Sequence, residues 1–452
     1  MIKRRKIQMS STQIILLSFL IVILVGSILL SLPISAKNGK VSYIDALFTA
    51  TTATCVTGLV TVSTASSWSV FGQVIILILI QIGGLGVITI LTAFMLMINK
   101  KIGISDRLLI QDAFNLNTLS GLVVFVKKVL LGTLTIEFIG ALFYMIVFIP
   151  EFGVRGIWIS IFNSISAFCN AGMDIIGENS LCNYATNPII NITTSILIIL
   201  GGLGYIVWWD IIRVIKLKKN GKYKFFKHLT LHSKIALCST MILIVFGAIT
   251  TLVFEYSNDL TIHNMSFFDK IQVSFFQSIT TRTAGFATIP QENLTNATAI
   301  SSMILMFIGG SPVGTAGGVK TVTIAVLLYT SFSMIKGKNE ATIFNRTISK
   351  QSIVKAIAVV ITFFSVILTS MILLSAVTKA PGIDIMFETI SAAATVGLSR
   401  NLTTSLNVFG KIIIIITMYF GRVGPISCAI AFGSKRSKQN AVNDPYEEIS
   451  IG

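Results

Sequence analysis

Four short stretches containing glycine recur along the chain at almost equal spacing, and this repeat restricts the possible folds more than any other feature. The intervals are 114, 113 and 112 residues, between Gly58, Gly172, Gly285 and Gly397. Each glycine follows a short amphipathic segment, and long apolar runs lie on either side. Self-similarity at a fixed period is typical of tandem copies of one structural unit. The sequence therefore predicts four copies of one unit, with their glycine loops brought together.

The composition places these units in a membrane. Of the 452 residues, 53% are hydrophobic and 12% are charged, and the mean hydropathy is +0.84. Soluble domains usually contain about 25% charged residues. The net charge of +17 would also suit a nucleic-acid-binding protein, but basic loops on one side of a membrane explain it better. We therefore expect an all-α integral membrane protein, surrounded by lipid, with no nucleic-acid partner.

Each unit is predicted to contain a first span, a short segment, a glycine loop and a closing span, which gives eight spans around one pore. The apolar runs are long enough to cross about 30 Å of hydrocarbon at 1.5 Å per residue. The short segments are residues 43–53, 157–168, 267–280 and 383–394. The spans are residues 14–32, 74–98, 129–149, 189–212, 235–254, 299–308 (resuming at 321), 357–377 and 408–432. The predicted units are residues 1–99, 100–216, 217–335 and 336–452, the last with a cytoplasmic tail.

Basic residues predict the orientation of the chain. They are concentrated at the amino terminus, in the connections between units and in the tail, in segments 3–6, 100–128, 213–234, 336–355 and 435–438. The glycine-loop sides contain fewer of them. By the positive-inside rule, both termini are cytoplasmic and the four loops enter the membrane from the outer face.

Glycine loops at membrane depth favour the binding of a cation. Irregular backbone there is tolerated only where it is buried in protein or lines a watery cavity, so four loops are expected to meet at one axis. Main-chain carbonyl groups can then replace the hydration shell of the cation, towards which the short helices direct their negative ends. The alternative is that these glycines are ordinary turn residues between helices. That alternative does not explain why four of them recur at matching spacing. The candidate filter residues are Val56, Thr57, Gly58, Leu59, Asn170, Ala171, Gly172, Met173, Thr283, Ala284, Gly285, Phe286, Thr395, Val396, Gly397 and Leu398.

Two features of the closing spans suggest a gate. Residues 309–318 interrupt the third closing span with five glycines and a proline, which exceeds what a kink or close helix packing requires. Arg422 lies inside the fourth closing span, where a buried cation is costly unless it is paired or hydrated. Gly421 follows its loop glycine by 24 residues, as Gly309 does, so Arg422 is expected at the level of the interruption. The alternative for Arg422 is snorkelling to the inner interface. Glu137, the other charge inside a span, has no assigned partner or role.

Several of these stretches together resemble the Ktr/Trk/HKT superfamily of potassium transporters, and within it the Ktr-type membrane subunits. The resemblance covers nearly the whole chain and is carried by residues 53–59, 164–174, 280–288, 309–320, 391–401 and 421–425. It implies that a glycine in each loop goes with selectivity for K⁺. Asn170, Ala171 and Ala284 depart from the tightest filter pattern, so discrimination against sodium is expected to be looser. A gating role is implied for Arg422 and for an intramembrane loop containing Gly309, Gly310, Gly314, Gly317 and Gly318.

The resemblance also implies partners and a location. It implies a homodimer in the bacterial plasma membrane, with a cytosolic nucleotide-binding regulatory subunit, a ring of the KtrA type, docked to its basic inner face. It further implies K⁺ as the transported ion and Na⁺ as a possible activator. The expected function is therefore potassium uptake by the translocating subunit of a Ktr-type system, with or without dependence on sodium, and without catalysis.

Two other classes of protein remain as alternatives. A secondary transporter with broken helices, for another small cation, would have matched interruptions in two repeats, whereas the sequence indicates one heavily broken unit. A membrane enzyme would need clustered catalytic groups at one face, and the best available, Asp174 and Glu178, lack a base or metal partner. The five cysteines show neither a disulfide framework nor metal-ligand spacing.

Overall fold

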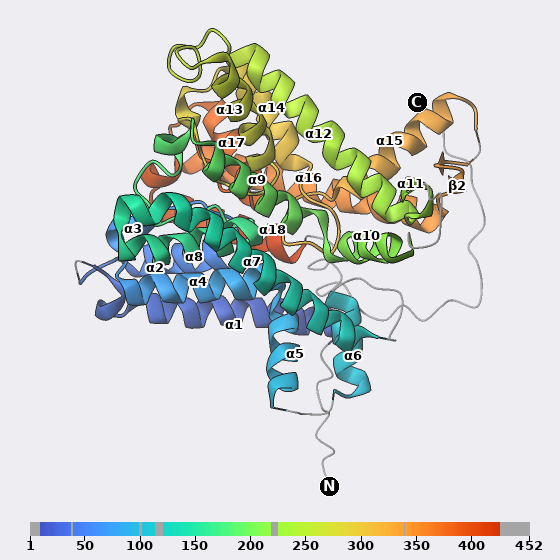
Figure 1. Cartoon of the computed structure of the whole chain (residues 1–452), viewed down its shortest axis with the longest axis horizontal. Helices are drawn as coiled ribbons and strands as arrows, with labels where there is room; N and C mark the ends of the chain where they lie inside the picture. The colour runs from blue at the N-terminus through green and yellow to red at the C-terminus, as the bar shows by residue number, and fades with distance from the viewer. Residues whose placement is uncertain are drawn as a thin grey trace.

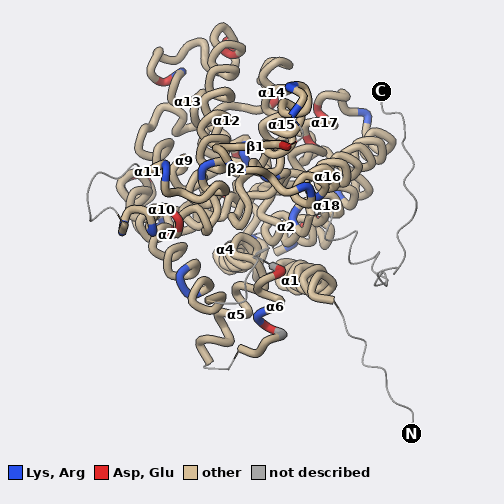
Figure 2. Tube along the Cα trace, turned by 90° about the vertical axis from the view of Figure 1, so that its right-hand side faces the viewer, with Lys and Arg blue, Asp and Glu red and all other residues tan. Residues whose placement is uncertain are grey.

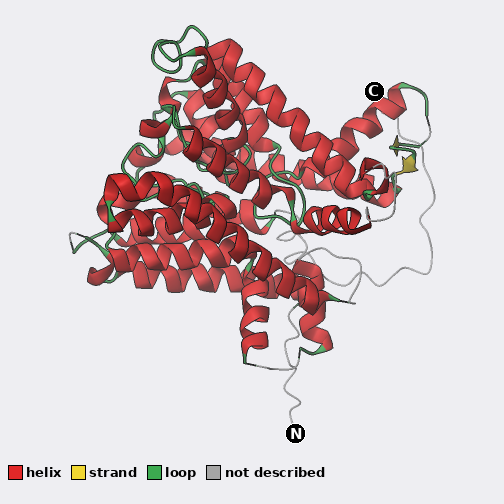
Figure 3. Ribbon diagram, in the orientation of Figure 1, coloured by secondary structure: helices red, strands yellow, loops and turns green. Residues whose placement is uncertain are grey.

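The computed structural model describes residues 10–37, 39–98, 102–113, 121–217, 225–338 and 340–424. Within these ranges the fold is almost entirely helical, and its two short strands, β1 (Thr342–Ile343) and β2 (Arg346–Thr347), form a small antiparallel hairpin (Figure 3). The basic segments 3–6 and 435–438, and residues 425–432 of the last predicted span, lie outside the described residues.

Four long helices are each long and apolar enough to cross a membrane. They are α1 (Ser11–Ser31), α7 (Leu122–Phe152), α12 (Leu231–Glu255) and α16 (Lys350–Val377). All four present large apolar side chains at the protein surface, for example Ile28, Leu131, Ile242 and Ile372. Apolar surface on this scale is rare on soluble proteins, and Figure 2 shows few charged residues along the helical body. The chain is therefore a multi-pass membrane protein.

Two further spans are sharply bent, contrary to the prediction of continuous spans at residues 74–98 and 189–212. The helices α4 (Val70–Leu85) and α5 (Val87–Met97) meet at 100°, and α9 (Pro188–Leu203) and α10 (Tyr205–Leu217) meet at 95°. The residue at each bend is a glycine with φ of +86°, Gly86 or Gly204. L-residues with a side chain rarely adopt this conformation. Glycine therefore lets the helix end at the bend without strain. The expectation that only the third unit is heavily broken is therefore wrong.

The third closing run is also interrupted, and the helix of the fourth ends at a glycine. The third consists of α14 (Asn296–Phe307) and α15 (Thr321–Ile335), with an irregular loop between them. The fourth, α18 (Val408–Val423), ends at Gly424, whose φ of +92° matches the bends in the first two units. A glycine break just beyond the glycine-rich turn is thus a repeated feature of the closing runs.

The four predicted short segments are helices that precede the glycine loops. They are α2 (Tyr43–Cys55), α8 (Val154–Cys169), α13 (Phe267–Thr280) and α17 (Gly382–Ala394). Each packs against the long helix before it in the sequence, so each helix pair is one local building block. Figure 1 shows these short helices inside the body, while α5 and the small helix α6 (Ile104–Ala113) project from one side.

Three closing helices approach the ends of the short helices so closely that only glycine fits. A Cβ atom built on the contacting glycine would lie 2.0 Å from a carbonyl oxygen of the short helix, well inside van der Waals contact. In every case that carbonyl belongs to the residue four positions before the loop glycine. The pairs are Gly83 with Thr54, Gly201 with Phe168, and Gly421 with Ala393. This repeated contact sets the position of each loop relative to its closing helix.

An ion pair and a hydrogen bond join the beginning of the chain to its end. The ammonium group of Lys411, on α18, lies 2.6 Å from the carboxylate of Asp45, on α2, and both side chains are largely buried. The same two parts of the chain are joined a second time, because the hydroxyl of Tyr419 on α18 donates to the carbonyl of Leu16 on α1 at 2.8 Å. The helices are therefore closed into a ring rather than an open row.

We predict that Gly201→Ala destabilises the protein, because its Cβ would collide with the Phe168 carbonyl. Overpacking of this kind costs about 1–3 kcal/mol. The neighbouring Gly202→Ala is the matched control, since a Cβ there would meet nothing closer than 3.7 Å. Thermal unfolding of the detergent-solubilised protein, followed by size-exclusion chromatography after heating, measures the difference. Equal stability of the two variants would contradict the close contact.

Candidate functional site

The four glycine loops share one backbone conformation. The residue two positions before each glycine has a positive φ, which is 56° at Val56, 60° at Asn170, 69° at Thr283 and 53° at Thr395. The loop glycines also have positive φ, of 98°, 62°, 84° and 94° in chain order. Two left-handed residues at fixed positions are uncommon, and four copies show that the loops are structural repeats.

The four loop glycines lie against one another in a closed ring, which we call the glycine ring. A Cβ built on any one of them would lie within 2.1–2.6 Å of the carbonyl oxygen just before the next glycine in the ring. The contacts run from the first loop to the second, third and fourth and then back to the first. They join Gly58 to Ala171, Gly172 to Ala284, Gly285 to Val396, and Gly397 to Thr57. The structure therefore brings the four predicted filter stretches together, with backbone facing backbone and no room for a side chain.

Hydroxyl groups of the short helices hold the loops in this shape. Thr52 Oγ1 accepts a hydrogen bond from the amide of Gly58 at 2.9 Å, and Ser391 Oγ accepts one from Gly397 at 3.1 Å. Ser166 Oγ accepts from the amide of Met173, whereas Thr280 donates to the carbonyl of Phe286. Sequence reasoning missed these four residues. The available signal was a hydroxyl residue five or six positions before every loop glycine.

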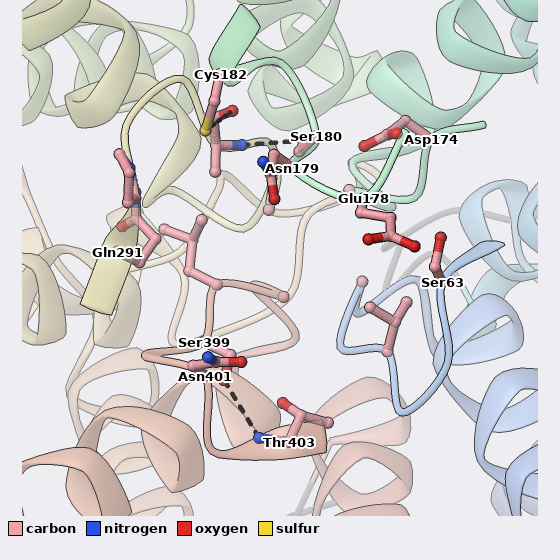
Figure 4. Close-up of a pocket in the computed structure, with 18 of the residues that line it drawn as sticks. Ser63, Asp174, Glu178, Asn179, Ser180, Cys182, Gln291, Ser399, Asn401 and Thr403 are labelled. Atoms are coloured by element: carbon pink, nitrogen blue, oxygen red, sulfur yellow. Dashed lines mark hydrogen bonds between the residues drawn. The ribbon is translucent and has the colours of Figure 1, made fainter. Parts of the chain in front are cut away.

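One side of the glycine ring opens into a cavity of about 530 Å³, which we call the vestibule. Loops from all four predicted units contribute to its lining (Figure 4). All three charged residues in that lining are acidic, Asp174, Glu178 and Glu292. Burial raises the pKa of the Asp174 carboxyl to about 6, although hydrogen bonds from the neighbouring loop oppose this shift. A concave acidic surface of this kind raises the local concentration of cations.

On the other side of the ring lies the interruption predicted at residues 309–318. In the structure it comprises residues 308–320, between α14 and α15, and we call it the interrupting loop. Its two ends are joined by hydrogen bonds from the amide of Gly309 to the carbonyl of Val319 and from Thr321 to Gly310, both at 3.0 Å. Its middle is bonded to the break between α9 and α10, where Tyr205 donates to the carbonyl of Val313 at 2.9 Å. The interruption is therefore a folded loop bound across the second unit, not a kink.

The interrupting loop touches the glycine loops directly. The hydroxyl of Thr315 donates to the carbonyl of Phe168 at 3.1 Å and to Oδ1 of Asn170 at 3.3 Å. Gly317 packs so closely on the hydroxyl of Thr395 that a Cβ would lie 2.0 Å from it. These contacts involve residues before the loop glycines, whereas the vestibule is lined by the glycines and residues after them. The vestibule and the interrupting loop therefore lie on opposite sides of the ring.

Arg422 binds the interrupting loop, so two candidate gating features are in contact. Its guanidinium group donates to the carbonyl of Thr315 through Nη1 and to the carbonyl of Gly83 through Nη2, the latter at 2.5 Å. It thus connects the loop with the closing helix of the first unit. On the loop itself, the ammonium group of Lys320 donates to the carbonyl of Ala316 at 2.6 Å.

Buried polar atoms without a hydrogen-bond partner gather just below the glycine ring. Among the described residues, they include the hydroxyls of Thr54, Thr283 and Thr395 and the amide nitrogen of Asn170. Buried hydroxyl and amide groups are normally satisfied, so the three threonine oxygens are available to water or to an ion, and the Asn170 nitrogen to a water molecule. Glu137, which had no partner in the sequence, is buried and accepts a hydrogen bond from Gln81 at 3.2 Å.

Comparisons with known proteins identify the family of the chain and a solved structure with a similar fold. A family model described as cation transport protein, TrkH, matches residues 3–443. The potassium/sodium uptake protein NtpJ of Enterococcus hirae is 41% identical, over 99% of this chain and 98% of its own. The Ktr system potassium uptake protein B of Bacillus subtilis is 38% identical, over 99% of this chain and 98% of its own. The crystal structure of the potassium transporter TrkH from Vibrio parahaemolyticus matches with a TM-score of 0.73 at 17% identity, over 94% of this chain and 86% of that one.

The fold and the full-length matches define the class of this multi-pass membrane protein as a cation transporter. The chain belongs to the TrkH family of cation transport proteins, in which the resemblance of its glycine loops had placed it.

We predict that Asp174→Asn raises the KM for the transported cation, with little effect on the maximal rate. The substitution removes a negative charge from the vestibule but leaves the glycine ring intact. Asp259→Asn is the control, because this carboxylate is 75% exposed and does not line the vestibule. Initial rates of ⁸⁶Rb⁺ uptake over a range of concentrations at low ionic strength separate the two parameters. An unchanged KM would show that the vestibule charge does not recruit the ion.

Proposed function

We propose that this chain takes up K⁺ across the bacterial plasma membrane, as the translocating subunit of a Ktr-type system. The glycine ring is the observation that carries the proposal. Its close backbone contacts leave carbonyl oxygens, and not side chains, as the groups available to a dehydrated ion. The uptake activities in the names of the Enterococcus and Bacillus relatives support K⁺ as the ion, with Na⁺ as a second cation or activator. The function requires no catalytic step.

The proposed pore consists of four units, residues 1–99, 100–216, 217–335 and 336–452, with two spans each. The repeated loop conformation and the Asp45–Lys411 ion pair between the first and last units support this arrangement. The four long helices serve as first spans. The closing spans are the bent pairs α4–α5 and α9–α10, the interrupted pair α14–α15, and α18 with the residues that follow it.

In the proposed transport cycle, K⁺ enters the acidic vestibule and exchanges its water for loop carbonyls at the glycine ring. The selectivity filter comprises residues 56–59, 170–173, 283–286 and 395–398. The unpaired threonine hydroxyls below the ring offer oxygen ligands on the inner side. The membrane potential drives the flux, since one charge crossing 100 mV gains about 2.3 kcal/mol.

The interrupting loop is proposed as the gate. It lies against Asn170 and Thr395 and so stands in the path of an ion leaving the filter. Arg422 holds it through the Thr315 carbonyl and adds a positive charge that opposes passage of a cation. Displacement of the loop would remove both obstacles.

The orientation and partners follow from the same arrangement. The vestibule is proposed to face outwards, with both termini in the cytoplasm, because the connections on the opposite side of the ring are rich in Lys and Arg. A homodimer is proposed, with a cytosolic nucleotide-binding subunit of the KtrA type on this basic face. The relatives named as Ktr system proteins support such a partner.

A broken-helix secondary transporter is a second candidate, favoured by the matched bends at Gly86 and Gly204. Such a transporter couples its substrate to an ion gradient. Uptake by proteoliposomes that have a membrane potential, but no Na⁺ or proton gradient, separates the two candidates. A pore carries K⁺ under these conditions, and a strictly coupled transporter does not.

We predict that Gly58→Ser lowers the preference for K⁺ over Na⁺ by about tenfold or more, because a Cβ would displace the carbonyl of Ala171 from the ring. Gly153→Ser is the matched control, since Gly153 also has a positive φ but would meet nothing within 4 Å. Competition between K⁺ and Na⁺ for uptake, in cells lacking their own potassium uptake systems, measures the preference. Unchanged selectivity in Gly58→Ser would remove the glycine ring from the filter.

We also predict that Arg422→Ala changes transport kinetics while the protein remains in the membrane. Loss of the guanidinium group frees the Thr315 carbonyl and removes the positive charge, so uptake without a regulatory partner should rise several-fold. Arg213→Ala is the control, because its side chain is 54% exposed and pairs with Asp210. Uptake kinetics like those of the parent, at equal amounts of protein in the membrane, would exclude Arg422 from gating.

A further inference from the structure

Arg282 is a second buried arginine at the junction of a glycine loop and the interrupting loop. It lies in the third glycine loop, next to Thr283, and only 7% of it is exposed. Its Nη2 atom donates to the carbonyl of Gly309 at 3.2 Å and also lies 3.5 Å from the hydroxyl of Thr240 on α12. Its Nε atom has no partner. Sequence reasoning assigned it no function.

Among the described residues around Arg282, no group neutralises its charge. No ion pair to Arg282 occurs within the part of the chain that the structure describes. The cavity next to it has a volume of about 10 Å³ and is lined mainly by apolar residues and glycines, together with Thr240. That space is close to the minimum for one water molecule and too small for a carboxylate. The carbonyl of Gly309 is therefore its main acceptor.

Gly309 is the second residue of the interrupting loop, two positions after the end of α14. Its amide is bonded to Val319 at the other end of the loop, so its carbonyl moves with the whole loop. If the loop moved away from the ring, the guanidinium group would lose this acceptor and remain buried and unsatisfied. That outcome is unfavourable for a charged group, so the hydrogen bond opposes movement of the loop.

We propose that Arg282 is a positioning residue that latches the interrupting loop in its closed position and ties that position to the third glycine loop. The loop is then held at two places, by Arg282 at Gly309 and by Arg422 at Thr315. The two arginines differ in what they connect. Arg422 joins the loop to the closing helix of the first unit, whereas Arg282 joins it to the backbone that carries Thr283. A change in the third glycine loop is thereby transmitted to the gate. This inference rests on the proposed function, in which the interrupting loop is the gate.

The test measures how often the loop leaves its closed position. Ser311→Cys places a thiol in the loop at a residue that is fully buried. The background carries serine at Cys182, Cys238 and Cys428, while Cys55 and Cys169 stay because both are buried. Inside-out membrane vesicles are treated with a cationic methanethiosulfonate reagent. The rate at which the introduced thiol at position 311 is modified is measured from the increase in protein mass.

Arg282→Gln is expected to raise the rate of modification by about tenfold, the effect of losing one charge-assisted hydrogen bond. Arg282→Lys, which keeps the charge with shorter reach, should give an intermediate rate. Arg155→Gln is the control, because it removes the same charge from an exposed arginine at the start of α8. Thr240→Val provides a variant with the guanidinium group intact, and its rate should rise by less than that of Arg282→Gln.

The result that overturns the latch is a rate in Arg282→Gln equal to that of Arg155→Gln, with both proteins folded by size-exclusion chromatography. If Arg282→Gln does not fold, a rate in Arg282→Lys equal to that of the parent overturns the latch. Potassium uptake by the parent is measured in parallel. If the parent takes up potassium but Arg282→Gln leaves the modification rate unchanged, only the latch is refuted. If the parent takes up no potassium, the proposed function is refuted, whatever the modification rates are.

Discussion

The close approach of backbone to backbone at the glycine ring is the constraint on which the rest of the structure depends. Each loop glycine faces the carbonyl of its neighbour at a distance that excludes even a methyl group. Such an approach also requires unusual backbone angles, which the short helices stabilise through the hydroxyls of residues such as Thr52 and Ser391. The closing helices in turn reach the short helices only because Gly83, Gly201 and Gly421 lack side chains. Small residues thus determine how near the four units come to their common centre.

Within this fourfold arrangement the third unit differs from the others. Its short helix ends at Thr280, and the next residue, Thr281, stays in the right-handed region instead of turning at once. Its anchoring hydroxyl is therefore five positions before the loop glycine instead of six. The same unit supplies the interrupting loop, whose contacts reach the second and fourth units. The third glycine loop and the interrupting loop, which follow one another in the chain, thus both depart from the common pattern.

Much of the fold could be predicted from the sequence because it depends on local patterns. Hydropathy placed the long helices, and amphipathic segments before regularly spaced glycines placed the short ones. The bends could not be predicted, because Gly83, Gly84 and Gly86 are equally able to adopt a positive φ and only packing selects Gly86. The contacts of Arg282 and Glu137 depend on segments that approach each other only in the folded chain, so sequence spacing carried no signal for them.

The ion pair between Asp45 and Lys411 has a consequence for how the protein is made. Asp45 and Lys411 are 366 residues apart in the sequence, so this contact, with the bond from Tyr419 to Leu16, forms between parts of the chain that are synthesised at very different times. A nascent chain that has not yet released Gly397 lacks one quarter of the glycine ring. The ring can therefore close only after the segment that contains Gly397 has left the ribosome, and a product truncated before this segment has no complete ring to place in the membrane.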